Sequence, residues 1–482
     1  MKRALIIVLV GRLIQMAVML ATLRAATTRL STVELGNFSL LASLSTFFVW
    51  ILISPLGPYL NRFTLDWRGR GTIWINYLRM AAYVVAVAAF TATTIYLWKL
   101  IFKPAWTLQL SWLGTSMAAY IIFSTFNTVT IPAINLFGRR VAYTLLYSAT
   151  QILCLAFSWF ITGIEARGEY WFLGQTAGFA LGFLLALPLF TKTTSPEKGQ
   201  HWRTSTRIRD GLKAVAIFCL PIVVTNGLFW VQFQSYRIVV GNLVSLEFLG
   251  LFFAGYSVSA GLLAAVEVAT GQFFGPYFYK HVQEAVPGRE QEGWAAYMSL
   301  LYPMIIVIVM AVIAVATPAT HLLLAPKFWT ASTYVAAGAV VEGIRVLCGG
   351  YSLATHVSKR THALLLPHVI GATTTLITLL GGTWLFGDAA VGPAMIFSAF
   401  VFLAAMHLIL TRHAGTSPAI LGWPWVLAAS LLMAALMLLK SHLSIQGVIA
   451  DLGFVVAVGL VLGVALLMIL RAARPLLLRF AR

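Results

Sequence analysis

Residues 389–411 read AAVGPAMIFSAFVFLAAMHLILT, an apolar run that contains no Asp, Glu, Lys or Arg. Because an α-helix rises about 1.5 Å per residue, a run of about 20 apolar residues can cross the hydrocarbon core of a membrane. Runs of this length recur along the whole chain of 482 residues, of which 60% are hydrophobic and only 10% are charged. Such a composition needs lipid as its solvent, so the sequence predicts an all-α polytopic membrane protein.

We expect about fourteen transmembrane helices. Their expected ranges are 4–23, 36–60, 75–98, 110–136, 141–163, 170–190, 212–234, 247–278, 297–317, 331–357, 362–385, 389–411, 422–440 and 449–470. No stretch is left over for a separate soluble domain. Because the count is even, both termini should lie on the same side of the membrane.

The Lys and Arg residues indicate which side that is. If the N-terminus is cytoplasmic, most of the 33 Lys and Arg residues fall in cytoplasmic loops, as the positive-inside rule requires. We therefore expect both termini and the basic loop 192–210 in the cytoplasm. The formal charge of +19 is dispersed over short loops, which excludes a nucleic-acid partner and favours attraction to anionic membrane lipids.

An internal repeat indicates how the helices are grouped. Residues 30–38 read LSTVELGNF and residues 245–252 read SLEFLGLF; in both, a Ser lies five residues before a Gly, a Glu lies between them and a Phe follows two residues after. The tripeptide GPY follows each segment, at 57–59 and at 275–277. The repeat predicts two six-helix lobes in the same orientation, as in many transporters. The expected domains are 1–191, a cytoplasmic linker 192–210, 211–412, and 413–482 with two C-terminal helices and an Arg-rich tail.

The sequence also resembles a known family. The stretch YRIVVG at 236–241, followed by LG at 249–250 and AGYS at 254–257, is similar to the seventh-to-eighth helix signature of bacterial polysaccharide flippases. These O-antigen-type, lipid-linked oligosaccharide flippases belong to the superfamily that includes the multidrug and toxin extruders. The resemblance implies a V-shaped fold whose two lobes enclose a cationic cavity and alternate between inward-open and outward-open states.

The resemblance also implies a function. It indicates a flippase that carries an undecaprenyl-diphosphate-linked, anionic sugar across the bacterial inner membrane for O-antigen, capsule or exopolysaccharide biosynthesis. The implied partners are this lipid-linked sugar, membrane lipids, and the polysaccharide polymerase and glycosyltransferases of the pathway. In the family an acidic residue often precedes the Arg of the signature, whereas Ser235 and Tyr236 precede Arg237 here.

Charged residues within an expected span are costly and mark candidate sites. Arg12 lies in the first expected helix with Gln15 one turn further on the same face. We expect this pair to bind a phosphate or sugar carboxylate, because a guanidinium can donate two hydrogen bonds to either. A structural Arg bonded to backbone carbonyls is the alternative. Arg79, near the inner end of the third helix, and Arg237, near the outer mouth, are further substrate-binding candidates that could instead snorkel to headgroups.

The second half of the chain contains two carboxylates and one Arg within expected spans. Glu342 and Arg345 are spaced to form an i,i+3 pair on the tenth helix. Arg345 could bind substrate, or the pair could only stabilise packing. Glu267, in the middle of the eighth helix, could carry a coupling proton, or it could be structural if an Arg is its partner.

The sequence contains no recognisable catalytic, metal-binding or phosphate-binding motif. There is no phosphate-cradling glycine loop, no metal-binding cluster and no nucleophile–base pair, so we expect no catalytic residue, no metal, no cofactor and no enzyme activity. The main alternative is a cation-coupled multidrug exporter of the same superfamily, which would need a carboxylate within the spans of the N-terminal lobe. A membrane polysaccharide polymerase or ligase would need a large outer loop, and a structural scaffold would have no reason to keep charges in the bilayer.

Overall fold

The computed structural model describes residues 2–102, 110–194, 208–283, 289–358, 361–414, 418, 421–443 and 447–474. These residues form helices and no strands, which confirms the predicted all-α class. The chain divides into two compact units, unit 1 (Met1–Gly250) and unit 2 (Leu251–Arg482). The lobe boundaries and the V-shaped arrangement expected from the sequence stay predictions, and residues 195–207 of the expected linker lie outside the described residues.

The helices follow the expected spans. Within the described residues, eleven helical segments are long and apolar enough to cross a membrane. One of these, His362–Arg412, covers α14 (Leu365–Phe386) and all but the last two residues of α15 (Val391–Ala414). Two more expected spans coincide with α1 (Lys2–Arg29) and with the apolar part of α8 (Ile208–Gln234). The expected number of about fourteen is therefore supported as an approximate count.

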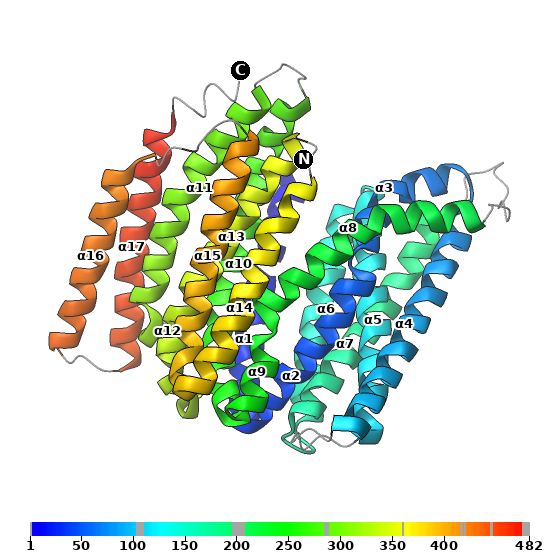
Figure 1. Cartoon of the computed structure of the whole chain (residues 1–482), viewed down its shortest axis with the longest axis horizontal. Coiled ribbons are helices and arrows are strands. Elements are labelled where there is room, and N and C mark those ends of the chain that lie inside the picture. The colour runs from blue at the N-terminus through cyan, green and yellow to red at the C-terminus, as the bar shows by residue number, and fades with distance from the viewer. Residues whose placement is uncertain are drawn as a thin grey trace. The chain divides into compact units, whose positions relative to one another are not determined.

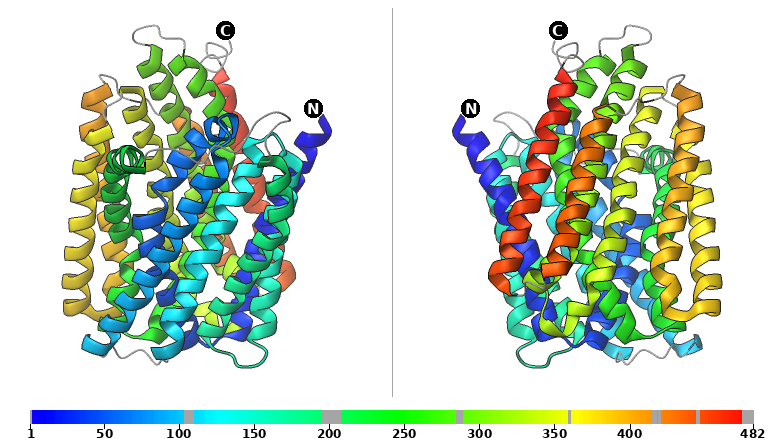
Figure 2. Two further views of the ribbon diagram at one scale, coloured as in Figure 1. Left: turned by 90° about the vertical axis from the view of Figure 1, so that its right-hand side faces the viewer. Right: turned by 90° about the vertical axis from the view of Figure 1, so that its left-hand side faces the viewer.

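The long helices of each unit run roughly alongside one another (Figures 1 and 2). The remaining helices are α2 (Thr32–Phe48), α3 (Leu56–Gly69), α4 (Ile73–Phe102), α5 (Leu110–Leu136), α6 (Arg140–Ile161), α7 (Gly168–Thr194), α9 (Tyr236–Leu243), α10 (Leu246–Gln283), α11 (Arg289–Ala314), α12 (Ala316–Leu323), α13 (Ser332–Ser358), α16 (Trp423–Leu443) and α17 (Val448–Ala472).

The expected second helix, 36–60, is interrupted in the structure. The α-helix ends at Phe48, a π-helical turn covers Val49–Ile53, and α3 begins at Leu56 as a separate helix. Pro55 stands at the break; proline lacks a backbone N–H and its ring collides with the carbonyl four residues earlier, which ends a regular helix. The continuous apolar run hid this break from sequence analysis.

Close helix packing in unit 1 depends on a glycine stripe along α7. A Cβ atom added to Gly174 or Gly178 would collide with the backbone of Ser158 or Cys154 on α6. Small residues repeated every four positions let two membrane helices approach closely. The Ser158 hydroxyl then donates to the carbonyl of Trp171 at 3.0 Å. Hydrogen bonds of this kind join α6 and α7 in a setting where lipid offers no competing partner.

The two copies of the repeat form matching helix starts. The Ser31 hydroxyl accepts a hydrogen bond from the backbone N–H of Glu34 at 3.2 Å, and the Ser245 hydroxyl accepts one from Phe248 at 3.0 Å. Each serine thus satisfies a backbone donor in the first turn of its helix. The shared Ser at the start of the repeat is therefore explained by helix capping.

In unit 2, α16 and α17 pack together against α11. Their buried contact includes Val307 of α11, Met433 of α16 and Val458 of α17. Asp451 of α17 makes polar contacts at one end of the hairpin: its Oδ1 accepts from Lys440 Nζ of α16 at 2.5 Å, and its Oδ2 lies 3.0 Å from Nδ1 of His321 on α12. The two C-terminal helices are thus attached by an apolar seam and by one buried carboxylate.

Candidate functional site

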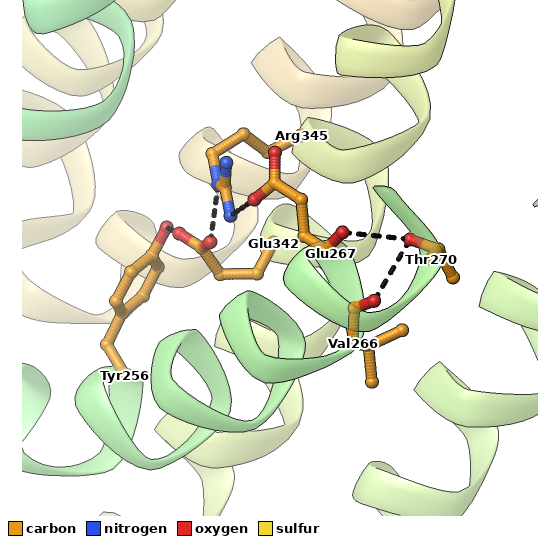
Figure 3. A network of polar contacts seen from close by, with 6 residues as sticks. All are labelled: Tyr256, Val266, Glu267, Thr270, Glu342 and Arg345. Carbon is orange, nitrogen blue, oxygen red and sulfur yellow. Dashed lines mark hydrogen bonds and ion pairs between the residues drawn. The ribbon is translucent and has the colours of Figure 1, made fainter. Parts of the chain in front are cut away.

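The charged side chains in the middle of unit 2 gather around Arg345. Its Nε donates to Glu342 Oε2 at 2.6 Å, and its Nη2 donates to Glu267 Oε2 at 2.8 Å. The Tyr256 hydroxyl donates to the second oxygen of Glu342 at 2.6 Å. Figure 3 shows Arg345 between the two carboxylates and Tyr256 beside Glu342. We name these four residues the Arg345 cluster.

The packing of α10 against α13 positions this cluster. Glu342 and Arg345 lie on one face of α13, three residues apart, whereas Tyr256 and Glu267 lie on α10. The backbones approach closely because Gly338 of α13 faces Tyr256, and because the Ser259 hydroxyl donates to the carbonyl of Val335 at 2.5 Å. A Cβ atom at position 338 would lie 3.2 Å from the Cα atom of Tyr256, so the two helices have little room for a larger residue there.

The Arg345 cluster holds one negative charge more than it holds positive charges when both carboxylates are ionised. The side chain of Glu342 is only 8% exposed and that of Arg345 is 18% exposed, whereas that of Glu267 is 41% exposed. Arg345 therefore compensates Glu342 in a buried setting. Glu267 is thus the more exposed of the two carboxylates.

In unit 1, Arg12 is the first member of a hydrogen-bonded chain that links α1 to α6. Its Nη1 donates to Gln15 Oε1 at 3.0 Å, and Gln15 Nε2 donates to the Ser148 hydroxyl at 3.2 Å. Ser148 lies eight residues after the first residue of α6, which is about 12 Å along the helix axis. Arg12 is half-buried, and within the described residues no carboxylate forms an ion pair with it. Its guanidinium is thus positioned by a neutral amide.

The other two candidate arginines lie outside these groups. Arg79 is on α4 and its Nη1 donates to Asn76 Oδ1 at 3.4 Å. Arg237 is on the short helix α9, where its Nε donates to the Tyr236 hydroxyl at 3.2 Å. Of the residues selected from the sequence, the structure therefore joins Arg12 with Gln15 and Arg345 with both carboxylates, and it places Arg79 and Arg237 on other helices.

Three polar partners in the structure were not predicted from the sequence. Tyr256 and Ser148 resemble ordinary helix residues, and their roles depend on contacts with helices far away in the sequence. Asp451 was detectable, because it is an acidic residue within the last apolar run and is only 5% exposed in the structure. Within the part of the chain that the structure describes, no three or more His, Cys, Asp or Glu residues gather as metal ligands would.

Comparisons with known proteins identify the fold. No protein-family model and no curated protein sequence matches the chain. Among solved structures, the lipid II flippase MurJ in an inward closed conformation matches with a TM-score of 0.65 and 11% identity, over 96% of this chain and 98% of that chain.

Two MATE transporters match less well. A MATE transporter from Vibrio cholerae, VcmN, gives a TM-score of 0.52 at 14% identity over 85% of this chain and 95% of that chain. An inward-facing multidrug resistance transporter of the MATE family, in the MOP superfamily, gives 0.51 at 12% identity over 84% and 96%. The chain therefore has the fold that MurJ and MATE transporters share.

Proposed function

We propose that this protein moves an anionic, lipid-linked oligosaccharide across the bacterial inner membrane by alternating access. The proposed cargo is a sugar unit on undecaprenyl diphosphate, and the termini and the loop 192–210 are proposed to be cytoplasmic. The proposed partners are the glycosyltransferases that build such a cargo and the polysaccharide polymerase that uses it. The match to a flippase of similar fold is consistent with this proposal.

The observation that carries the proposal is the position of Arg12. A charged Arg within the hydrocarbon region costs at least about 2.5–3.5 kcal/mol on insertion scales. In the structure its partner is the neutral Gln15, so the positive charge is positioned but not neutralised by that contact. A phosphate or a sugar carboxylate of the cargo supplies the missing negative charge and accepts two hydrogen bonds from the guanidinium.

In this proposal the Arg345 cluster is not the main cargo-binding site, unlike Arg12. Two of the Arg345 nitrogens donate to Glu342 and Glu267. These contacts support a role for Arg345 in holding the carboxylates, with less of its guanidinium left to bind cargo than in Arg12. Arg79 and Arg237 stay in the proposal as cargo contacts on α4 and α9.

The excess negative charge of the Arg345 cluster favours a second candidate, a cation-coupled multidrug exporter. Glu267 is partly exposed and could bind a proton or a cationic compound. The MATE transporters that share this fold are consistent with that alternative. Arg12 argues against it in unit 1, because its half-buried positive charge repels cationic cargo.

Deletion of the gene, with return of the wild-type gene as control, distinguishes the two candidates. A flippase predicts accumulation of undecaprenyl-diphosphate-linked sugar in lipid extracts, on the cytoplasmic leaflet, with unchanged drug susceptibility. Hypersensitivity to cationic dyes without such accumulation would establish the exporter instead.

A further inference from the structure

Unit 1 contains a basic pocket that shares no lining residue with the Arg12 or Arg345 groups. It has a volume of about 290 Å³ and is lined by Arg68, Phe137, Arg139, Leu189, Lys192 and Thr193. Three of these six residues are cationic and none is acidic. Each cation comes from a different element: Arg68 from α3, Arg139 from the turn between α5 and α6, and Lys192 from the last turns of α7.

The walls of the pocket suit a small anion. The guanidinium of Arg68 lies over the ring of Phe137, 5.1 Å from its centre, which holds that cation in place. Arg139 is the N-cap residue of α6, and no side chain caps this helix. The first N–H groups of α6 and its positive dipole end therefore add to the field of the three cations. The volume is at the lower limit for ligand pockets and fits a headgroup better than an oligosaccharide.

The amphipathic helix α3 indicates that the pocket opens at a membrane surface. Tyr59, Phe63 and Trp67 follow one another at four-residue spacing, with ring centres 4.6 Å apart for the first pair and 6.4 Å for the second. Aromatic side chains in such a row, on a helix whose last turn is basic, are typical of the boundary between lipid and water. Figure 1 shows α3 at the upper end of unit 1. Arg68, which lines the pocket, directly follows Trp67.

We propose that this basic pocket binds a phosphate group, supplied by the headgroup of an anionic phospholipid of the cytoplasmic leaflet or by a soluble phosphate compound. Basic pockets between membrane helices on the cytoplasmic side are suited to phosphate headgroups. Arg68 and Arg139 can each donate two hydrogen bonds to the phosphate oxygens, and Lys192 adds a point charge. This site is separate from Arg12 and does not depend on the cargo proposed above.

The test uses the full-length protein in nanodiscs of phosphatidylcholine with increasing phosphatidylglycerol, with lipid retention measured by native mass spectrometry. The triple variant Arg68→Gln, Arg139→Gln, Lys192→Gln is compared with a matched control, Arg412→Gln, Arg471→Gln, Arg474→Gln. The control removes the same charge from exposed helix ends in unit 2. We expect the pocket variant to retain phosphatidylglycerol on the order of a hundredfold more weakly than wild type, and the control to retain it normally.

A second arm identifies the source of the phosphate. Inorganic phosphate is added to nanodiscs of pure phosphatidylcholine, and thermal stabilisation of the protein is measured. Stabilisation that the pocket variant loses would assign a soluble phosphate compound, whereas retention of phosphatidylglycerol alone would assign the lipid. Equal loss of lipid in the control triple, or no loss in either, would overturn the proposal. If the triple variant does not fold, the exposed single variant Arg139→Gln decides, with about tenfold weaker retention expected.

Discussion

Gly36 and Gly250, the shared glycines of the internal repeat, face each other where α2 meets the first turns of α10. A Cβ atom on Gly36 would collide with the backbone carbonyl of Leu246, and one on Gly250 would collide with that of Thr32. The two copies of the repeat are thus in mutual contact, each supplying the small residue that the other copy needs.

This contact predicts that Gly36→Ala lowers the stability of the protein. We expect a loss of about 1–3 kcal/mol from forced separation of the helices, measured as a lower melting temperature of purified protein. Gly271→Ala in α10 is the matched control, because a Cβ atom there meets nothing within 4 Å. The control should be neutral or slightly stabilising, since alanine favours helix over glycine. Equal melting temperatures for the two variants would contradict the packing argument.

Replacement of Arg12 should abolish transport without unfolding the protein. Arg12→Ala removes a guanidinium whose partner is a neutral amide, so no carboxylate is left buried and unpaired. Arg12→Lys should keep part of the activity, because it keeps the charge and loses the two-pronged hydrogen bonding. Cargo accumulation and protein level in membranes are the two measurements. Arg70→Ala, at the exposed end of α3, is the control. Normal transport by a well-folded Arg12→Ala protein would remove the main support for the cationic site.

The Arg345 cluster should respond to mutation as one unit. Arg345→Leu leaves Glu342 buried without its cation, and a buried unpaired charge costs about 3–5 kcal/mol. The triple variant Arg345→Leu, Glu267→Gln, Glu342→Gln removes all three charges and should recover most of the melting temperature. No recovery would mean that the ion pairs are not what the single variant disturbs.

Within that cluster, substitution of Glu267 and substitution of Glu342 should have different effects on the melting temperature. Glu267→Gln should leave the melting temperature almost unchanged, because its side chain is 41% exposed, whereas Glu342→Gln should lower it by several degrees. If Glu267 couples transport to a cation, Glu267→Gln will in addition reduce transport at a normal protein level. Equal losses of melting temperature in both variants would show that the exposure of a carboxylate does not determine its contribution to stability.

The polar attachment of the α16–α17 hairpin can be measured by a double-mutant cycle. Asp451 of α17 contacts His321 of α12, which lies outside the hairpin, so Asp451→Ala and His321→Ala should be coupled in their effects on the free energy of unfolding. We expect a coupling energy of about 0.5–3 kcal/mol, as for residues in direct contact. Additive effects on the free energy of unfolding would show that the hairpin is attached only by its apolar contacts with α11.

The amino-acid sequence by itself determined the fold class, the places of the long helices and the charged residues worth testing. These features follow from local properties: the length of an apolar run, and the cost of a charge within it. The Glu342–Arg345 pair was predictable for the same reason, since helical geometry alone brings residues three apart together. The capping serines of the repeat also depend only on neighbouring residues.

Tertiary structure decided which of these residues act together. Arg345 reaches Glu267 on another helix because glycine and serine let α10 and α13 approach, and Gln15, the partner of Arg12, reaches Ser148 through the packing of α1 on α6. The basic pocket gathers Arg68, Arg139 and Lys192 from three elements, and each of these residues lies more than fifty positions from the next along the chain. Spacing along a helix says which residues share a face, but helix packing decides what that face meets, because such contacts depend on shape at positions remote in sequence.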